Sequence, residues 1–139
     1  MAKHVLKLEA DVDFDLVGIC SHHPDYRLCW ALNDQLRLRL TKANEPFCVS
    51  NKKGGVVSEH SFYEWFDEVN HIEYYFIKNK GGGKYLIPEE PQIDYFLVLR
   101  ENNIVAISAL VAQLKQNSGI ITALEIDAVN LKSADKLIF

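Results

Sequence analysis

The chain has 139 residues, 15 basic and 19 acidic residues that give a formal net charge of -4, and 48% hydrophobic residues. This length and this balance of hydrophobic and charged residues predict one globular domain over residues 1–139 and exclude a disordered, collagen-like or coiled-coil chain. The negative net charge argues against a dedicated nucleic-acid-binding protein, which usually carries a basic balance.

Three features of the sequence predict a cytoplasmic protein outside the membrane. Residues 1–4 lead directly into an alternating segment, without the apolar region of a secretory signal. The longest apolar run away from the termini, residues 104–112, is interrupted only by Ser108 and is far shorter than the roughly 20 residues of a membrane span. The chain has three cysteines, an odd number, so we expect reduced thiols at Cys20, Cys29 and Cys48.

The first third of the chain predicts two strands and a helix. Residues 3–9 form the first strand, and residues 10–20 form a second in which apolar and acidic residues alternate. A short helix over residues 16–20 is the alternative, which Gly18 disfavours. Pro24 suits a first helical turn, and leucines recur every four residues from Leu28 to Leu40, so a helix follows and passes into a strand near residues 37–40.

The middle of the chain predicts a loop and an aromatic hairpin. Residues 41–60 are loop-like around a short strand at 47–49. Strands near 61–67 and 71–78 are joined by a loop at 67–70. Pairing centred on that loop places Trp65 opposite Ile72 and Tyr63 opposite Tyr74. The same pairing sets Glu64 against Glu73, and this repulsion leaves the register open.

The last third predicts a central strand, a helix and a final strand. Residues 80–84 form a turn, and residues 93–99 are apolar on both faces, as in the middle of a sheet. Asn102 or Asn103 caps a helix over 103–116, whose core stripe is Ile104, Ile107, Val111 and Leu114. Residues 120–126 form the last strand. The fold class is therefore α+β, a mainly antiparallel sheet of order β-β-α-β meander-α-β with the helices packed on one face.

One segment carries a family resemblance. Ile87-Pro88-Glu89-Glu90-Pro91-Gln92-Ile93-Asp94-Tyr95 resembles the motif that gives the IPExxxVDY family its name, with Ile93 in place of valine. Residues 16–19, residues 25–33 and the ending from residue 125 are also similar to that family. The resemblance implies a small bacterial cytoplasmic protein, and it supplies no activity, cofactor or catalytic residue.

The motif itself has two interpretations. Its prolines force extended backbone before them and donate no ladder hydrogen bond, so the segment is the entry to a strand. Glu89 and Asp94 lie at the mouth of that strand, where they can accept backbone N–H groups or meet Arg27. We expect these carboxylates to brace a rigid turn while Tyr95 packs in the core. The alternative is a ligand or partner site formed by Ile87, Pro88, Glu89, Ile93, Asp94, Tyr95 and Arg27.

Metal and nucleophile patterns in the sequence are incomplete. Cys20, His22, His23 and Cys29 are residue types that bind zinc, but their spacing fits no standard zinc pattern. The alternating aspartates of residues 11–15 lack the glycine and glutamate of a calcium loop. Cys20 with a neighbouring histidine is a weak candidate nucleophile. We therefore expect no metal, no cofactor and no enzymatic activity.

Basic residues form two candidate sites for phosphate or nucleic acid. Lys78, Lys80 and Lys84 flank a glycine run that can form a nest of backbone N–H groups, although no Walker pattern is present. The second group combines Arg37, Arg39, Lys52 and Lys53 with the aromatic hairpin, as in proteins that bind single-stranded nucleic acid. The more common roles of such residues are a flexible hairpin loop and core aromatic side chains.

These observations favour a non-catalytic domain that binds another protein or acts as a scaffold. The support is the missing catalytic constellation, the aromatic hairpin and the apolar ending Leu137-Ile138-Phe139. We expect that ending to be docked, either in its own domain or across the interface of a homo-oligomer. The alternative function is a small-ligand or RNA-binding module that uses the basic loops at 37–53 and 78–84.

Overall fold

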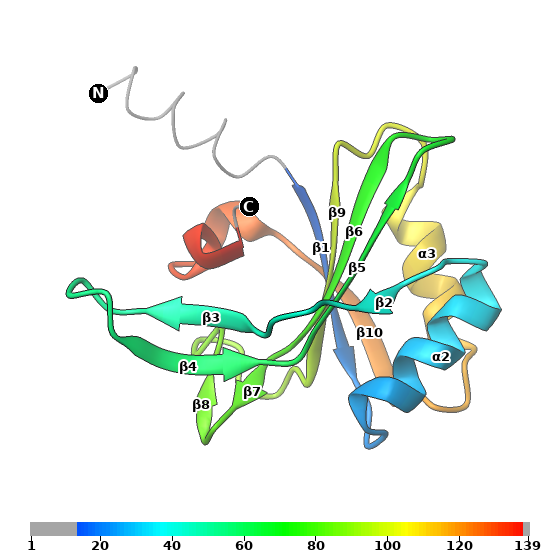
Figure 1. Ribbon diagram of the computed structural model, residues 1–139. Coiled ribbons are helices and arrows are strands. Elements are labelled where there is room, and N and C mark those ends of the chain that lie inside the picture. The colour runs from blue at the N-terminus through cyan, green and yellow to red at the C-terminus, as the bar shows by residue number, and fades with distance from the viewer. Residues whose placement is uncertain (1–13, 138–139) are drawn as a thin grey trace.

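A six-stranded antiparallel sheet forms the centre of the computed structural model, which describes residues 14–137 (Figure 1). The strand order is β10-β1-β9-β6-β5-β2. The strands are β1 (Phe14–Cys20), β2 (Thr41–Lys42), β5 (Phe62–Asp67), β6 (Ile72–Lys78), β9 (Tyr95–Arg100) and β10 (Thr122–Ile126). The predicted α+β class with a mainly antiparallel sheet is confirmed, whereas the strand predicted at 3–9 lies outside the described residues.

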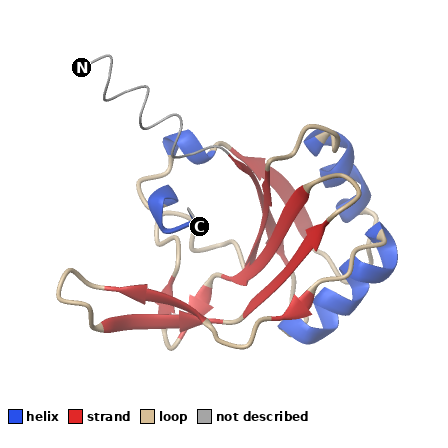
Figure 2. Ribbon diagram, turned by 45° about the horizontal axis from the view of Figure 1, so that its top comes forward, coloured by secondary structure: helices blue, strands red, loops and turns tan. Residues whose placement is uncertain are grey.

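The two α-helices, α2 (Asp25–Leu36) and α3 (Ile107–Lys115), lie on one side of the sheet (Figure 2). The opposite side is covered by short elements: the hairpin of β3 (Phe47–Ser50) and β4 (Val56–His60), the hairpin of β7 (Lys80–Gly81) and β8 (Lys84–Tyr85), and the 3₁₀-helices η1 (Ala128–Asn130) and η2 (Ala134–Leu137). Residues 41–60 therefore contain a second hairpin, and the sequence analysis missed β4.

The sheet separates two hydrophobic cores. On the helix side, Leu28 and Leu32 of α2 pack with alternate residues of the strands, such as Leu97. On the other side, Ile87 and Ile93 of the IPE-like motif pack with Phe96 and with the C-terminal 3₁₀-helices. Because β9 is buried on both faces, its near-continuous apolar run correctly predicted a central strand.

Leu137, the last residue that the structure describes, is fully buried in the second core. The prediction of a docked ending is therefore confirmed for Leu137, within its own domain. Ile138 and Phe139 lie outside the described residues.

The predicted register of the aromatic hairpin was wrong by two residues. Trp65 pairs with Tyr74, and Asp67 pairs with Ile72 as the last residue of β5. The turn explains this register, because the Asp67 carboxylate accepts the backbone N–H groups of both Val69 and Asn70 and closes the loop one residue later. A shift of two residues keeps every side chain on its predicted face of the sheet.

Both helices differ from prediction at one end. After α2, Arg37 has a φ of 56° and its N–H donates to the carbonyl of Asn33, so the helix stops before β2 instead of passing into it. Helix α3 begins at Ile107, four residues late, because the Asn102 side chain accepts the N–H groups of Ile104 and Val105 and stabilises a separate turn. Ile104 is consequently 63% exposed and does not belong to the core stripe.

Candidate functional site

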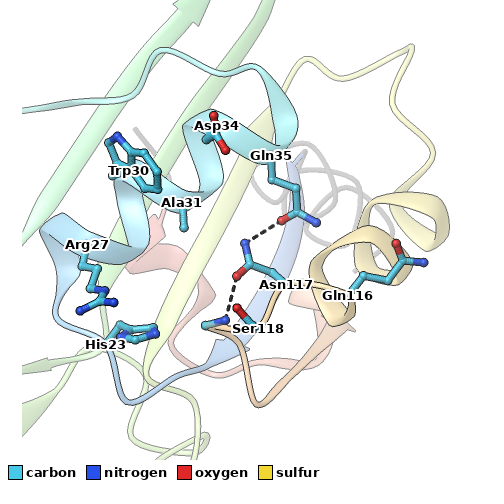
Figure 3. Close-up of a pocket in the computed structure, with 10 residues that line it drawn as sticks. His23, Arg27, Trp30, Ala31, Asp34, Gln35, Gln116, Asn117 and Ser118 are labelled. Atoms are coloured by element: carbon cyan, nitrogen blue, oxygen red, sulfur yellow. Dashed lines mark hydrogen bonds between the residues drawn. The ribbon is translucent and has the colours of Figure 1, made fainter.

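A groove lies between α2 and the loop that follows α3, and we call it the α2 groove (Figure 3). Its volume is about 410 Å³. The lining residues are His23, Arg27, Trp30, Ala31, Asp34, Gln35, Gln116, Asn117, Ser118 and Gly119.

Hydrogen bonds fix the loop side of this groove. The Asn117 Nδ2 donates to Gln35 Oε1 at 3.0 Å, and its Oδ1 accepts the Gly119 N–H at 2.8 Å (Figure 3). Gly119 approaches His23 so closely that a Cβ at this position would lie 2.7 Å from the ring Cδ2. The groove is therefore formed before any partner arrives, which lowers the entropic cost of binding.

Large exposed side chains lie on α2 at and beside the groove: Arg27 and Trp30 line it, whereas Tyr26 lies outside its lining. Tyr26 and Trp30 are each 69% exposed and are spaced one helical turn apart on α2. Arg27 lies between them in sequence, and its guanidinium has no hydrogen bond or ion pair with another residue of the described chain. We call Tyr26, Arg27 and Trp30 the aromatic face. Tyr, Trp and Arg are the residue types most enriched among interface hot spots.

Sequence reasoning missed this aromatic face, although the sequence carried a signal for it. Trp30 lies two residues from both Leu28 and Leu32, and a helix turns by about 100° per residue. The leucines that enter the core therefore direct Trp30 to the opposite side of α2. The position of a large aromatic residue on the side of a helix opposite the core indicates a surface site better than its residue type alone does.

Residues of the IPE-like motif form hydrogen bonds with the segment that leads into α2. The Asp94 Oδ2 accepts the N–H of Ser21 at 2.8 Å, and the Tyr95 hydroxyl donates to the carbonyl of His23 at 2.6 Å. The Ser21 hydroxyl in turn donates to the carbonyl of Gly119. Through these bonds the motif positions both sides of the α2 groove.

The other motif carboxylate, Glu89, binds the C-terminal region. It accepts the N–H and the hydroxyl of Ser133 at 2.8 and 2.9 Å. Partial burial raises the pKa of Glu89, but its hydrogen bonds, including those from Ser133, outweigh burial and hold that pKa below its usual value. Of the two contacts expected for these carboxylates, the structure shows the backbone N–H groups of Ser21 and Ser133 and not Arg27, which lies in the α2 groove.

Asn79 organises the motif and was also missed. Its side chain is fully buried, donates to the carbonyls of Glu90 and Ile93, and accepts the N–H of Ile87 at 2.9 Å. Asn79 stands between two lysines just before three glycines, a segment that the sequence analysis interpreted as a flexible hairpin turn, with a phosphate-binding loop as the alternative. An asparagine in such a turn is equally typical of a residue that satisfies backbone groups.

The glycines near residue 80 have a local structural role. Gly82 and Gly83 have φ values of 58° and 84°, which the two-residue turn between β7 and β8 requires. A Cβ at Gly81 would collide with the backbone of Glu59 in β4, so this glycine permits close packing of the hairpins. Lys80 and Lys84 are exposed on this hairpin, while Lys78 is half-buried in β6.

The second basic group is not assembled. Arg37 and Arg39 follow α2, whereas Lys52 and Lys53 lie at the tip of the β3–β4 hairpin, at the opposite end of the molecule (Figure 1). The predicted aromatic platform is also reduced, because Tyr63 and Tyr74 are buried in the helix-side core; Trp65 and Tyr75 are half-buried. The sequence analysis was therefore wrong to combine these four cations into one patch.

Cys20 and Cys29 lack the lowered pKa of a reactive thiol. Burial raises the pKa of the Cys29 thiol to about 11, whereas nucleophilic thiols have lowered pKa values. Burial and the nearby Asp94 also raise the pKa of Cys20. Within residues 14–137, no group of three or more His, Cys, Asp or Glu side chains is placed to hold a metal ion.

The described helices are also too short or too polar to cross a membrane.

Comparison with models of known protein families and with curated proteins found no match to this chain. The resemblance to the IPExxxVDY family therefore stays a prediction based on the motif and the similar segments around it.

Proposed function

We propose that this chain is a non-catalytic domain that binds another protein through the α2 groove and the aromatic face. The observation that carries this proposal is the 69% exposure of both Tyr26 and Trp30, one turn apart, beside Arg27, whose guanidinium has no hydrogen bond or ion pair among residues 14–137. A monomeric protein rarely leaves two such rings in water, and an interface covers them. Three free cysteines support a cytoplasmic location for this function.

The two exposed rings supply part of the free energy that binding requires, which also has to offset the cost of association. A buried aromatic side chain covers about 150–250 Å². Covering the exposed 69% of each ring is worth roughly 3–4 kcal/mol at about 25 cal/mol per Å². Arg27 adds a charged donor that pairs with a partner carboxylate, and the fixed loop at Asn117 limits the ordering cost on this side.

Affinity capture with matched variants tests the proposal. The tagged wild-type protein, a Tyr26→Ala/Trp30→Ala variant and an Ile104→Ala/Val129→Ala variant are each used to capture proteins from a lysate of the native organism. Ile104 and Val129 are exposed apolar residues outside the α2 groove, so this control removes similar surface elsewhere. We expect a protein that is retained by the wild type and the control and lost with the aromatic variant. Identical retention by all three would contradict the proposal.

A cavity at the end of β6 favours a second candidate, binding of a small anion. Lys78, Lys80, His22 and His23 are among the residues that line this cavity of about 510 Å³, together with Asp94. Isothermal titration with inorganic phosphate tests it. Binding that is lost in Lys78→Ala/Lys80→Ala and kept in Lys52→Ala/Lys53→Ala would support this candidate, whereas no heat of binding would eliminate phosphate as its ligand.

A further inference from the structure

A second cleft lies on the other side of the α2 C-terminus, between the chain that leads from α2 to β2 and the β5–β6 hairpin. Its volume is about 620 Å³, and we call it the arginine cleft. The lining residues are Arg37, Arg39, Trp65, Phe66, Asp67, Glu68, Val69 and Asn70. It shares no lining residue with the α2 groove.

The backbone fixes both arginines of this cleft on the outside of the molecule. Leu38 and Leu40 are buried in the helix-side core, so the alternate residues Arg37 and Arg39 are directed to solvent. The N–H of Arg37 donates to the carbonyl of Asn33, which holds the first arginine in its left-handed conformation. The guanidinium groups of both arginines lack hydrogen bonds and ion pairs to any residue that the structure describes.

Asp67, one of the two acidic residues that line the cleft, forms no ion pair with either arginine. The Asp67 carboxylate accepts two backbone N–H groups and the Asn70 side-chain amide of its own turn. Asp67 therefore serves the hairpin turn and leaves both guanidinium groups available. A guanidinium group presents paired N–H donors that match a carboxylate in a two-point contact.

The opposite wall of the cleft, formed by the β5–β6 hairpin, carries exposed apolar side chains beside the polar residues Asp67, Glu68 and Asn70. Phe66 is 48% exposed and Val69 is 87% exposed at the tip of the hairpin. Trp65 is half-buried and stacks on Tyr74 with ring centroids 5.4 Å apart, which makes this wall rigid. An occupant of the cleft therefore meets two positive charges on one side, and on the other side exposed apolar side chains next to Asp67, Glu68 and Asn70.

We infer that the arginine cleft binds an acidic peptide segment of a partner protein, in which one or two carboxylates pair with Arg37 and Arg39 and an apolar side chain covers Phe66 and Val69. The charge distribution favours a peptide over nucleic acid. Glu68 is exposed and lines the cleft, so a continuous run of phosphates places charge against it, whereas a peptide can place its carboxylates at the arginines and an apolar side chain elsewhere. The domain then has two separate docking surfaces and can bridge two partners.

Selection from a random peptide library displayed on phage tests this inference. The library is selected on the wild-type protein, and the enriched peptides are synthesised and titrated against variants. We expect peptides that combine acidic and apolar residues, and binding at least about tenfold weaker for Arg37→Glu/Arg39→Glu. Lys52→Glu/Lys53→Glu changes the net charge by the same amount at the distant hairpin tip and should change affinity less than about twofold, as should Tyr26→Ala/Trp30→Ala.

Several outcomes would overturn the inference. Enriched peptides without acidic residues, equal weakening by both charge-reversal variants, or no enriched peptide at all would each exclude an acidic ligand in the arginine cleft. A twelve-residue uridine oligonucleotide that binds more tightly than the peptides, and loses binding in Arg37→Glu/Arg39→Glu, would assign the cleft to RNA instead. If the glutamate variant melts below the assay temperature, Arg37→Gln/Arg39→Gln replaces it, with the same tenfold loss expected.

Discussion

Replacing Asn79 by alanine should destabilise the fold more than any other single change of a polar side chain in the IPE-like motif region. The substitution removes two donated hydrogen bonds, to the carbonyls of Glu90 and Ile93, and one accepted from the N–H of Ile87. Each such bond contributes about 1 kcal/mol, and a buried group left without a partner costs more. We therefore expect Asn79→Ala to lower the free energy of unfolding by about 3–5 kcal/mol, a large part of the 5–15 kcal/mol typical of a domain.

Thermal denaturation followed by circular dichroism, with urea denaturation to obtain the free energy, measures this loss. For a domain of this size each kcal/mol lowers Tm by roughly 3 °C, so the variant should melt about 10–15 °C below the wild type. Lys80→Ala is the matched control, because its side chain is exposed and adjacent in sequence; we expect a change within about 0.5 kcal/mol. An Asn79→Ala variant that melts within about 2 °C of the wild type would refute the claim that this side chain holds the motif.

Three further changes have defined outcomes. Asp94→Ala removes the acceptor of the Ser21 N–H and should cost about 1–3 kcal/mol in urea denaturation, whereas an unchanged midpoint would contradict its bracing role. Burial lowers the pKa of His60 below 6.5, although its hydrogen bond to the Lys78 carbonyl acts in the opposite direction. The unfolded chain therefore binds more protons than the folded chain as the pH falls below about 6.5. The contribution of His60 to stability should be complete above about pH 6.5 and should decrease as the pH drops toward the folded pKa. His60→Gln should flatten that fall between pH 7 and pH 5, and parallel pH profiles would contradict the assignment. Leu137→Ala should lower the free energy of unfolding by about 2–5 kcal/mol at unchanged molecular mass, and an equally stable variant would show that the buried ending contributes nothing.

Local patterns predicted the elements of this fold because they report burial directly. The apolar run of β9 indicated a strand covered on both faces, and the leucine spacing of α2 indicated the face that enters the core. The ends of elements depend on single side-chain hydrogen bonds that no periodicity records. Asp67 sets the register of the β5–β6 hairpin in this way, and Asn102 delays the start of α3.

The candidate site was harder to predict because its parts come from distant segments. The sequence analysis concentrated on the IPE-like motif, whose carboxylates turned out to bond to Ser21 and Ser133. The α2 groove needs α2 and the loop at Asn117 to lie together, and only the tertiary structure brings them within hydrogen-bond distance. The exposure of Trp30, in contrast, follows from the helix period and was available in the sequence.

Photo-cross-linking from position 30 tests the proposed role of the α2 groove most directly. The photoreactive amino acid p-benzoylphenylalanine replaces Trp30 in cells of the native organism, and a second strain carries it at Ile104, which is 63% exposed away from the groove. Irradiation should produce one discrete adduct of higher mass from position 30, containing a partner protein, and none from position 104. No adduct from position 30, or the same adducts from both positions, would contradict a protein-binding role for this surface.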